Sequence, residues 1–346
     1  MGHGEPVDRE WLRNLSIMRR FLTANAFVLS LLATVGIATL LPARGGFAPV
    51  VDHATTVAIA LLFFLYGTRL SPREAWAGLR HWRLHLTVVV ATFVVFPLLG
   101  LLVGLTDLPT PELAVGIAFL CCLPSTVQSS IAFTSVARGN VAAAICAASF
   151  SNLLGIVVSP LLVALVLGGQ GGISGRAVLD VALQLLAPFL LGQLARPWIG
   201  RFLARHHRLL GLVDRGSILL VVYSAFGEGV VEGVWQRTSV TSLVALVGLE
   251  VVLLAVVLLA TWHAGRLFSL PREDRVTIMF CGSKKSLASG LPMAGVLFAG
   301  PVVGLVVLPL MLYHQLQLMV CAALAQRLAR SVDDAAVVTT REEVRR

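Results

Sequence analysis

The chain has 346 residues, of which 57% are hydrophobic and 13% are charged, and its mean hydropathy is +0.87. This composition excludes a water-soluble globular protein of this length. The formal net charge is +9, but the basic residues occur in short blocks between apolar segments, which argues against a nucleic-acid-binding protein. The sequence is that of a protein whose solvent is the lipid bilayer.

The apolar segments are about 20 residues long and show no alternation of apolar and polar residues, so they predict an all-α polytopic membrane protein rather than a barrel. In chain order, the ten expected spans are 21–41, 50–68, 85–105, 113–137, 141–167, 177–195, 217–235, 241–262, 276–298 and 301–327. The first span is too long for the core of a cleaved signal peptide, so we interpret it as a retained helix. We expect an N-terminal segment over 1–20, a membrane domain over 21–328 and a tail over 329–346.

The orientation of the chain follows from its arginines. Twenty-two of them fall in the N-terminal segment, the even-numbered connections and the tail, and three fall in the odd-numbered connections. Because cytoplasmic connections are enriched in basic residues, both termini are predicted to be cytoplasmic, in a plasma or inner membrane. All six tryptophans lie at or beyond the ends of the spans, as expected of residues at the membrane interface.

Ten spans divide into two sets of five with opposite orientation, which is the arrangement of an inverted repeat, here about 21–168 and 177–328. The fourth span of each set is interrupted by polar residues, at Leu123–Ser130 and at Cys281–Ser286. At about 1.5 Å per residue, both breaks lie near the middle of the membrane. Paired broken helices at that depth indicate the binding site of a transporter.

Lys284 and Lys285, in the second break, are the two lysines of the chain. A charge at this depth costs from a few to more than about ten kcal/mol on an isolated helix, so it marks a site with a partner or a watery cavity. Successive helical residues point about 100° apart, so one lysine is expected to face the cavity while the other packs elsewhere. The alternative is that both lie at the cytoplasmic interface and bind lipid phosphates.

The candidate substrate- or ion-binding residues are polar groups in or near the two breaks. They are Ser125, Thr126, Gln128, Ser129, Ser130, Asn152, Glu228, Ser283, Lys284, Lys285 and Ser286. Hydroxyl and amide groups can replace the hydration of a ligand without adding charge. The alternative is that they bond to carbonyls freed by Pro124 or join adjacent helices. Glu228 is either a counter-ion for a lysine or part of another wet cavity.

The five cysteines fall in apolar segments without C-x-x-C spacing, so we interpret them as packing residues and expect neither a metal site nor a bound cofactor. The stretch Gly282–Ser286 ends like a phosphate-binding loop. Lys284 occupies its glycine position, however, and no strand precedes it, so no nucleotide site is expected.

Three stretches, Phe64–Arg69, Leu123–Asn140 and Phe280–Met293, resemble the bile acid:sodium symporter superfamily, most closely the branch that includes the solute carrier family 10 member 7 proteins and bacterial relatives. The resemblance implies two inverted five-helix repeats that form a panel and a core domain, with the broken helices crossing and the substrate between the domains. Sodium-coupled members carry an acidic residue near the crossing, where this chain has Lys284 and Lys285. Coupling to either Na⁺ or H⁺ therefore stays open.

We predict a secondary active transporter, not an enzyme, that moves a small organic anion by alternating access, with the bilayer as its other partner. The anion is expected to meet half-helix N-termini and a lysine ammonium. One alternative is a regulator of ion or calcium homeostasis built on a transporter scaffold. A second is an intramembrane enzyme with a lysine Schiff base, although no general base lies near the lysines in sequence.

Overall fold

The computed structural model describes residues 26–69, 81–104, 110–167, 175–233, 239–298 and 302–345, together with Gly300. These residues form helices and their connections, without a strand. Six of the described helical segments are long and apolar enough to cross a bilayer. They are Gly45–Thr68, Trp82–Gly104, Val141–Leu167, Leu210–Val231, Val240–Leu267 and Val303–Ser331. The chain is therefore all-helical and of the multi-pass membrane class.

Seven of the expected spans overlap one continuous helix each in the described part of the chain. These helices are α2 (Ala26–Leu40), α3 (Ala48–Arg69), α9 (Val141–Leu167), α10 (Gly175–Arg205), α11 (His207–Val231), α12 (Val240–Leu267) and α15 (Val303–Arg345), with the 3-10 turn η1 (Gly45–Phe47) before α3. The third expected span is α5 (Trp82–Val90) and α6 (Phe96–Gly104), joined by the π-helical stretch η3 (Ala91–Val95).

The two spans with predicted breaks are each divided into two helices. The first consists of α7 (Pro111–Cys122) and α8 (Gln128–Val136), and the second of α13 (Arg272–Gly282) and α14 (Leu287–Leu297). These helices have 9 to 12 residues, so none is long enough to span a bilayer alone. Pro124 lacks an N–H and forces the preceding Leu123 into an extended conformation (φ −79°, ψ 157°), which ends α7.

Several helix ends differ from the expected ones. Helix α10 runs ten residues beyond 195 and α11 begins ten residues before 217, so His206 alone separates them. Helix α15 likewise continues through the expected tail to Arg345. Hydropathy marks only the apolar part of a helix, and these extensions contain charged residues. The expected N-terminal segment, 1–20, lies outside the described residues.

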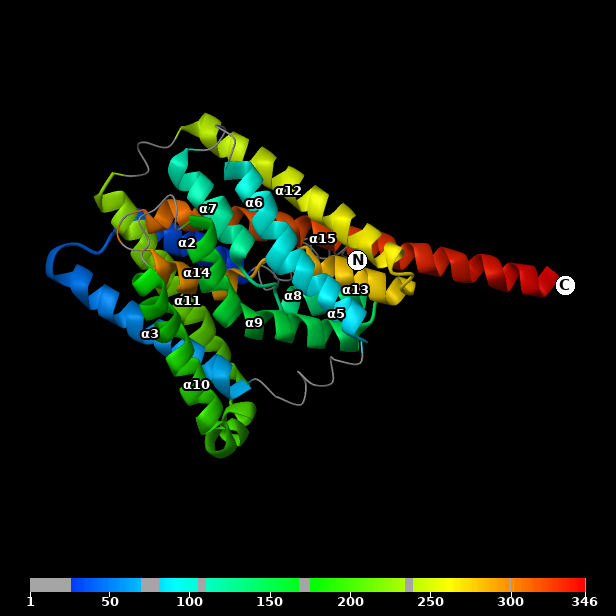
Figure 1. Cartoon of the computed structure of the whole chain (residues 1–346), viewed down its shortest axis with the longest axis horizontal. Coiled ribbons are helices and arrows are strands. Elements are labelled where there is room, and N and C mark those ends of the chain that lie inside the picture. The colour runs from blue at the N-terminus through cyan, green and yellow to red at the C-terminus, as the bar shows by residue number, and fades with distance from the viewer. Residues whose placement is uncertain are drawn as a thin grey trace, which may run out of the picture.

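The helices form two groups. Helices α2, α3, α10 and α11 pack on one another, most extensively α3 against α10. The second group contains α5 to α9 and α12 to α15, in which α7 packs on α6 and α15, and α13 packs on α12, α5 and α8. Figure 1 shows α3 and α10 at the lower left and α5, α12 and α13 at the right. Helix α11 connects the groups through α14 and α15.

Glycine permits the close packing of α3 on α10. A Cβ atom on Gly67 would collide with the carbonyl oxygen of Phe189, and one on Gly192 would collide with that of Phe64. Small residues at a helix contact let the two backbones approach, which is how membrane helices gain packing energy in lipid. The α3–α10 pair is therefore a backbone-to-backbone contact.

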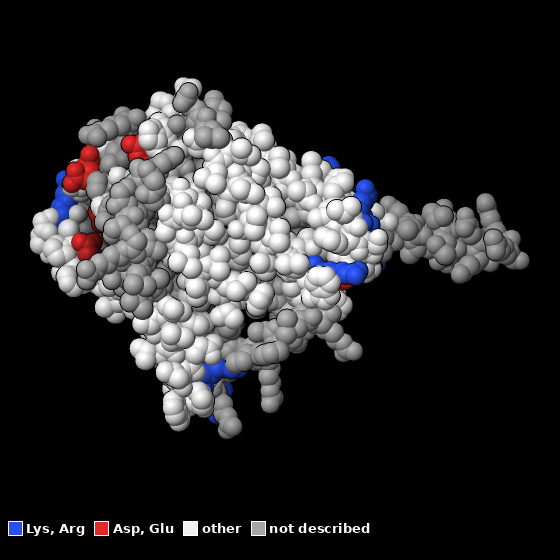
Figure 2. All heavy atoms as spheres, viewed as in Figure 1, with Lys and Arg blue, Asp and Glu red and all other residues white. Residues whose placement is uncertain are grey.

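The surface has the distribution expected of a protein in a bilayer. Large apolar side chains are exposed, among them Leu40 and Leu165, which are 81% and 80% exposed. Figure 2 shows an uncharged surface across the middle of the molecule, with the charged residues it draws at the ends and lower edge. An exposed apolar surface of this extent faces lipid in a membrane protein.

Candidate functional site

The two broken helices meet at their breaks. Across this junction, the Ser286 N–H donates to the Pro124 carbonyl at 2.9 Å. The Ser125 hydroxyl donates to the Cys281 carbonyl, and the Ser130 hydroxyl donates to the Phe280 carbonyl at 3.1 Å. These hydroxyls occupy carbonyls at the end of α13 that have no partner within the helix. Hydrogen bonds between the breaks therefore make them one structural unit.

Gln317 of α15 holds the second break from the opposite side. Its Oε1 accepts from the Lys285 N–H at 2.8 Å, and its Nε2 donates to the Lys285 carbonyl at 2.9 Å. Tyr313, one helical turn earlier, donates its hydroxyl to the Ser283 carbonyl at 3.0 Å. All four residues that supply or receive these bonds, Gln317, Lys285, Tyr313 and Ser283, are buried. Non-helical backbone at this depth is thus paired with side chains instead of water.

The two lysines are fully buried and make different contacts. Lys285 Nζ donates to the carbonyls of Thr92, Cys121 and Leu123 at 2.9, 2.8 and 2.7 Å. Lys284 Nζ has no hydrogen-bond partner among the described residues and lies 4.0 Å from the centre of the Phe133 ring and 5.5 Å from that of Phe280. Both side chains are 0% exposed, so the alternative in which they bind lipid phosphates at the membrane surface is wrong.

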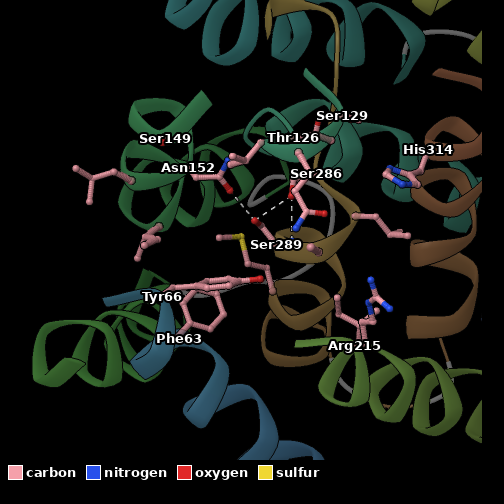
Figure 3. Close-up of a pocket in the computed structure, with 18 of the residues that line it drawn as sticks. Phe63, Tyr66, Thr126, Ser129, Ser149, Asn152, Arg215, Ser286, Ser289 and His314 are labelled. Atoms are coloured by element: carbon pink, nitrogen blue, oxygen red, sulfur yellow. Dashed lines mark hydrogen bonds between the residues drawn. The ribbon is translucent and has the colours of Figure 1, made fainter. Parts of the chain in front are cut away.

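Asn152 of α9 connects both breaks. Its Nδ2 donates to the Ser125 carbonyl at 2.7 Å and to the Ala148 carbonyl at 3.1 Å, and its Oδ1 accepts from the Ser289 hydroxyl at 2.8 Å. Ser289 also bonds to Ser286, the residue that caps α14. Figure 3 shows this chain of bonds from Asn152 through Ser289 to Ser286 at the edge of a cavity.

The cavity has a volume of about 560 Å³ and lies between the two groups of helices. Its apolar wall includes Phe63 of α3, Phe189 of α10 and Met293 of α14. The polar lining comes from both breaks and from four other helices. It consists of Tyr66, Thr126, Gln128, Ser129, Ser149, Asn152, Arg215, Ser286, Ser289 and His314. A mainly apolar cavity with a few converging polar groups is the usual form of a small-molecule site.

The polar lining is electrostatically one-sided. Residues 126–129 and 286–289, which include the first residues of α8 and α14, both line the cavity. Helix N-termini leave N–H groups free and carry a partial positive charge. Arg215 of α11 adds a full positive charge, and no aspartate or glutamate is among the described lining residues. This arrangement favours a negatively charged ligand.

His314 of α15 also lines the cavity (Figure 3). The second hydrogen of Gln317 Nε2 points to His314 Nδ1, 2.9 Å away. Because Gln317 Oε1 is occupied as an acceptor by Lys285, Nε2 is the donor and His314 Nδ1 the acceptor. A neutral His314 then carries its hydrogen on Nε2.

The structure brings together most, but not all, of the residues singled out from the sequence. Thr126, Gln128, Ser129, Asn152 and Ser286 line the cavity. Ser125 and Ser130 join the breaks, while the Ser283 hydroxyl bonds back to the Met279 carbonyl at 2.6 Å. Helix joining thus accounts for Ser125 and Ser130, while the residues that line the cavity remain candidates for binding.

The lysines differ from the expectation that one of them faces the cavity, because neither is among its lining residues. The first residues of both half-helices line the cavity, whereas Lys285 Nζ bonds to the carbonyls of Cys121 and Leu123 at the C-terminal end of α7, which attracts a positive charge. Glu228 is also not with the lysines. It lies three residues from the end of α11, and Ser224 is within 3.4 Å of Glu228 Oε1 and 3.3 Å of Asp52 Oδ1.

Four residues that matter at or near this site were not singled out from the sequence: Arg215, His314, Gln317 and Glu250. The span expected to begin at 217 placed Arg215 in a connection, although the structure has it in α11. Glu250 lies in the middle of α12 and is 1% exposed, and neither of its oxygens has a hydrogen-bond partner in the part of the chain that the structure describes. An acidic residue inside an apolar span was a signal for it. The described residues contain no group of three or more His, Cys, Asp or Glu that could hold a metal ion.

The fold and the site define a class: a multi-pass helical membrane protein with a ligand-sized, mainly apolar cavity on which the polar groups of two joined helix breaks converge. The chain belongs to the SBF-like CPA transporter family, whose family model matches residues 25–330. The resemblance seen in the sequence is thereby confirmed.

Relatives cover nearly the whole chain. An uncharacterized protein of Pseudomonas aeruginosa is 54% identical over 92% of this chain and 96% of its own length. "Putative symporter YfeH" of Escherichia coli is 51% identical over 91% of this chain and 96% of its own. "Sodium/bile acid cotransporter 7" of Mus musculus is 30% identical over 86% of this chain and 90% of its own. The chain is thus a membrane transporter by family.

Proposed function

We propose that this chain is a secondary active transporter that binds a small organic anion in the cavity at the two breaks and carries it by alternating access. The observation that carries the proposal is the charge of the lining. The N-terminal residues of two half-helices and Arg215 converge on one cavity without a described carboxylate. A carboxylate, sulfonate or sulfate group would receive hydrogen bonds from the helix ends and from the guanidinium.

The rest of the ligand would lie against the apolar wall. A cavity of about 560 Å³ accommodates an organic molecule of moderate size rather than an inorganic ion. Phe63, Phe189 and Met293 offer apolar contacts at a distance from the helix ends. The substrate class that fits is an anionic head on an apolar body. The name of the mouse relative includes bile acid, so cholate is a reasonable first probe of this class.

The architecture that we propose for transport consists of ten spans in two inverted repeats, about 21–168 and 177–328, with both termini cytoplasmic. Helices α2, α3, α10 and α11 would form the panel domain, and the remaining helices the core domain that carries the breaks. The cavity has lining residues in both groups. Movement of one group against the other would therefore open the cavity to either side of the membrane. An ion gradient, of Na⁺ or H⁺, would drive net uptake.

Thermal unfolding in detergent tests the binding site directly. Cholate, aliphatic carboxylates and alkyl sulfates of graded length would be screened for those that raise the melting temperature. We expect anions with apolar bodies to raise it in the wild type and to lose the effect in Arg215→Gln. Arg205→Gln, which removes the same charge from the exposed end of α10, is the matched control. An anion-induced shift of equal size in Arg215→Gln and wild type would refute the site.

Transport itself is tested in proteoliposomes with the anion that gives the largest shift. Uptake should exceed that of empty liposomes and should fall in Arg215→Gln but not in Arg205→Gln. Imposed gradients of Na⁺ and of H⁺ are compared separately. Uptake that neither gradient accelerates would contradict secondary active transport and would leave facilitated diffusion.

A further inference from the structure

The Lys285 ammonium has the surroundings of a bound monovalent cation. Its three hydrogens are all used, on the carbonyl oxygens of Thr92, Cys121 and Leu123 at 2.7 to 2.9 Å. The face of the Phe96 ring covers a further side, with its centre 4.0 Å from Nζ. The side chain is 0% exposed. Within the described residues, the charge is thus met by three backbone oxygens and the face of an aromatic ring.

Each of the three carbonyls is left without its usual partner by the local sequence. In η3, the Phe96 N–H bonds to Ala91, and π-helical pairing would give Thr92 the N–H of Pro97, which has none. At the end of α7, the Ser125 N–H, which would reach Cys121 in a continuing helix, bonds to the Ser151 hydroxyl instead. The Leu123 carbonyl follows the last residue of the same helix. Three freed oxygens thus converge on one point.

Rings of backbone carbonyls are the ligands with which membrane proteins replace the hydration shell of a small monovalent cation. The C-terminal end of α7 adds its partial negative charge to them. The main chain at Lys285 is also fixed by Gln317, which bonds to both its N–H and its C=O. The carbonyl oxygens are thus fixed by the first break and η3, and the main chain that carries the ammonium is fixed by Gln317.

We propose that Lys285 is a tethered cation: its ammonium permanently occupies a monovalent-cation site formed by the carbonyls of Thr92, Cys121 and Leu123. With the side chain shortened, this site becomes a binding site for small monovalent cations, with ammonium and methylammonium as the best fit in size and hydrogen bonding. The consequence for transport rests on the proposed function: no Na⁺ is required at this site during the cycle.

Lys284 provides an internal comparison. It is equally buried, but its Nζ lies on aromatic rings and bonds to no carbonyl. Removing it leaves no set of oxygen ligands behind. Any effect of cations that depends on the carbonyl site should appear with Lys285→Ala and not with Lys284→Ala.

The test is chemical rescue measured by thermal unfolding in detergent. Wild type, Lys285→Ala and Lys284→Ala are compared in the chlorides of ammonium, methylammonium, Na⁺, K⁺ and choline at equal ionic strength. We expect Lys285→Ala to melt several degrees lower than wild type in choline and to recover most of the loss in ammonium or methylammonium. For wild type and for Lys284→Ala, the melting temperature should not depend on which of the five salts is present. Equal melting of Lys285→Ala in all five salts would overturn the proposal.

A second measurement keeps the proposal testable if Lys285→Ala does not fold. The melting temperature of wild type is compared in Na⁺ and in choline, because an occupied site should give no difference. A rise specific to Na⁺ that Gln317→Leu abolishes would mean that Na⁺ binds at this junction despite the lysine, which overturns the proposal. None of these measurements uses a transported substrate. The cation-site proposal can therefore be tested even if no transported anion is found.

Discussion

Gln317 holds both backbone groups of Lys285, accepting from its N–H at 2.8 Å and donating to its carbonyl at 2.9 Å. The residue lies one turn below Tyr313 on α15, so a single helix fixes the second break at two places. Lys285 is 0% exposed, so water cannot replace Gln317 as the hydrogen-bond partner of its N–H and carbonyl groups. The position of the ammonium and that of the half-helix α14 therefore both depend on this amide.

Gln317→Leu should destabilise the protein strongly, because it removes the amide while keeping a side chain of broadly similar volume. It orphans one buried N–H and one buried C=O, each at a cost of about 1–3 kcal/mol. We expect a loss of about 2–5 kcal/mol in unfolding free energy, measured by denaturant or thermal unfolding in detergent. Gln315, on the same helix, takes no part in these bonds, so Gln315→Leu should leave the unfolding free energy nearly unchanged. Equal effects of the two substitutions would remove the role assigned to the amide.

Gly67→Ala and Gly192→Ala should each disrupt the α3–α10 contact. The added methyl group collides with a carbonyl oxygen of the facing helix, which cannot move without moving its backbone. Overpacking of this kind costs about 1–3 kcal/mol, and more where backbone must shift.

The matched controls for this pair are Gly36→Ala and Gly248→Ala, in α2 and α12, where a Cβ would meet no atom within 4 Å. Alanine is the better helix former by up to about 1 kcal/mol, so these controls should be neutral or stabilising. A melting temperature for Gly67→Ala as high as that of Gly36→Ala would show that the two backbones do not approach as closely as the structure has them.

The positions of the breaks were predictable because they are local. Pro124 removes a backbone N–H and so interrupts the helix. A run of polar residues within an apolar span is costly to expose to lipid, so it is expected in the interior of the protein. The directions of the lysine side chains were not predictable. Helical periodicity assigns a direction only to wound backbone, and Lys284 and Lys285 lie between α13 and α14, where φ and ψ follow tertiary hydrogen bonds such as those of Gln317.

The missed lining residues have a different cause. Hydropathy is low around an arginine, so the sequence prediction placed Arg215 in a connection. In the structure α11 begins at His207 and contains Arg215. His314 and Gln317 stand in an otherwise apolar span and carry no local pattern that distinguishes cavity lining from helix joining. Only the packing of α15 on α7, α8 and α14 places them at the site.

Glu250→Met should raise the melting temperature. The carboxyl group is 1% exposed, and neither of its oxygens has a hydrogen-bond partner, so the folded state carries its full desolvation cost. Methionine fills a similar volume without that cost, and we expect a gain of about 1–3 kcal/mol. Glu232→Met at the exposed end of α11 should change stability by less than about 0.5 kcal/mol. A loss of stability in Glu250→Met would instead reveal a partner for the carboxyl, such as a bound cation.

Asn152→Asp should weaken the binding of anions and also loosen the junction of the breaks. The Asn152 amide donates to the carbonyls of Ser125 and Ala148, and aspartate would place an oxygen against both of them. It would also add a negative charge to the cavity lining. We expect a lower melting temperature without ligand and a smaller shift on adding the anion that stabilises wild type most.

Gln128→Glu separates these two effects. Gln128 is an exposed lining residue at the start of α8, where a carboxylate is stabilised by the helix N-terminus by about 0.3–1 kcal/mol. Its ligand-free stability should therefore be unchanged or higher, while the built-in carboxylate competes with an added anion for the same helix end. Both variants should show a smaller anion-induced shift than wild type, and Asn152→Asp alone should melt lower without ligand. An undiminished shift in Gln128→Glu would mean that the anion binds away from the N-terminus of α8.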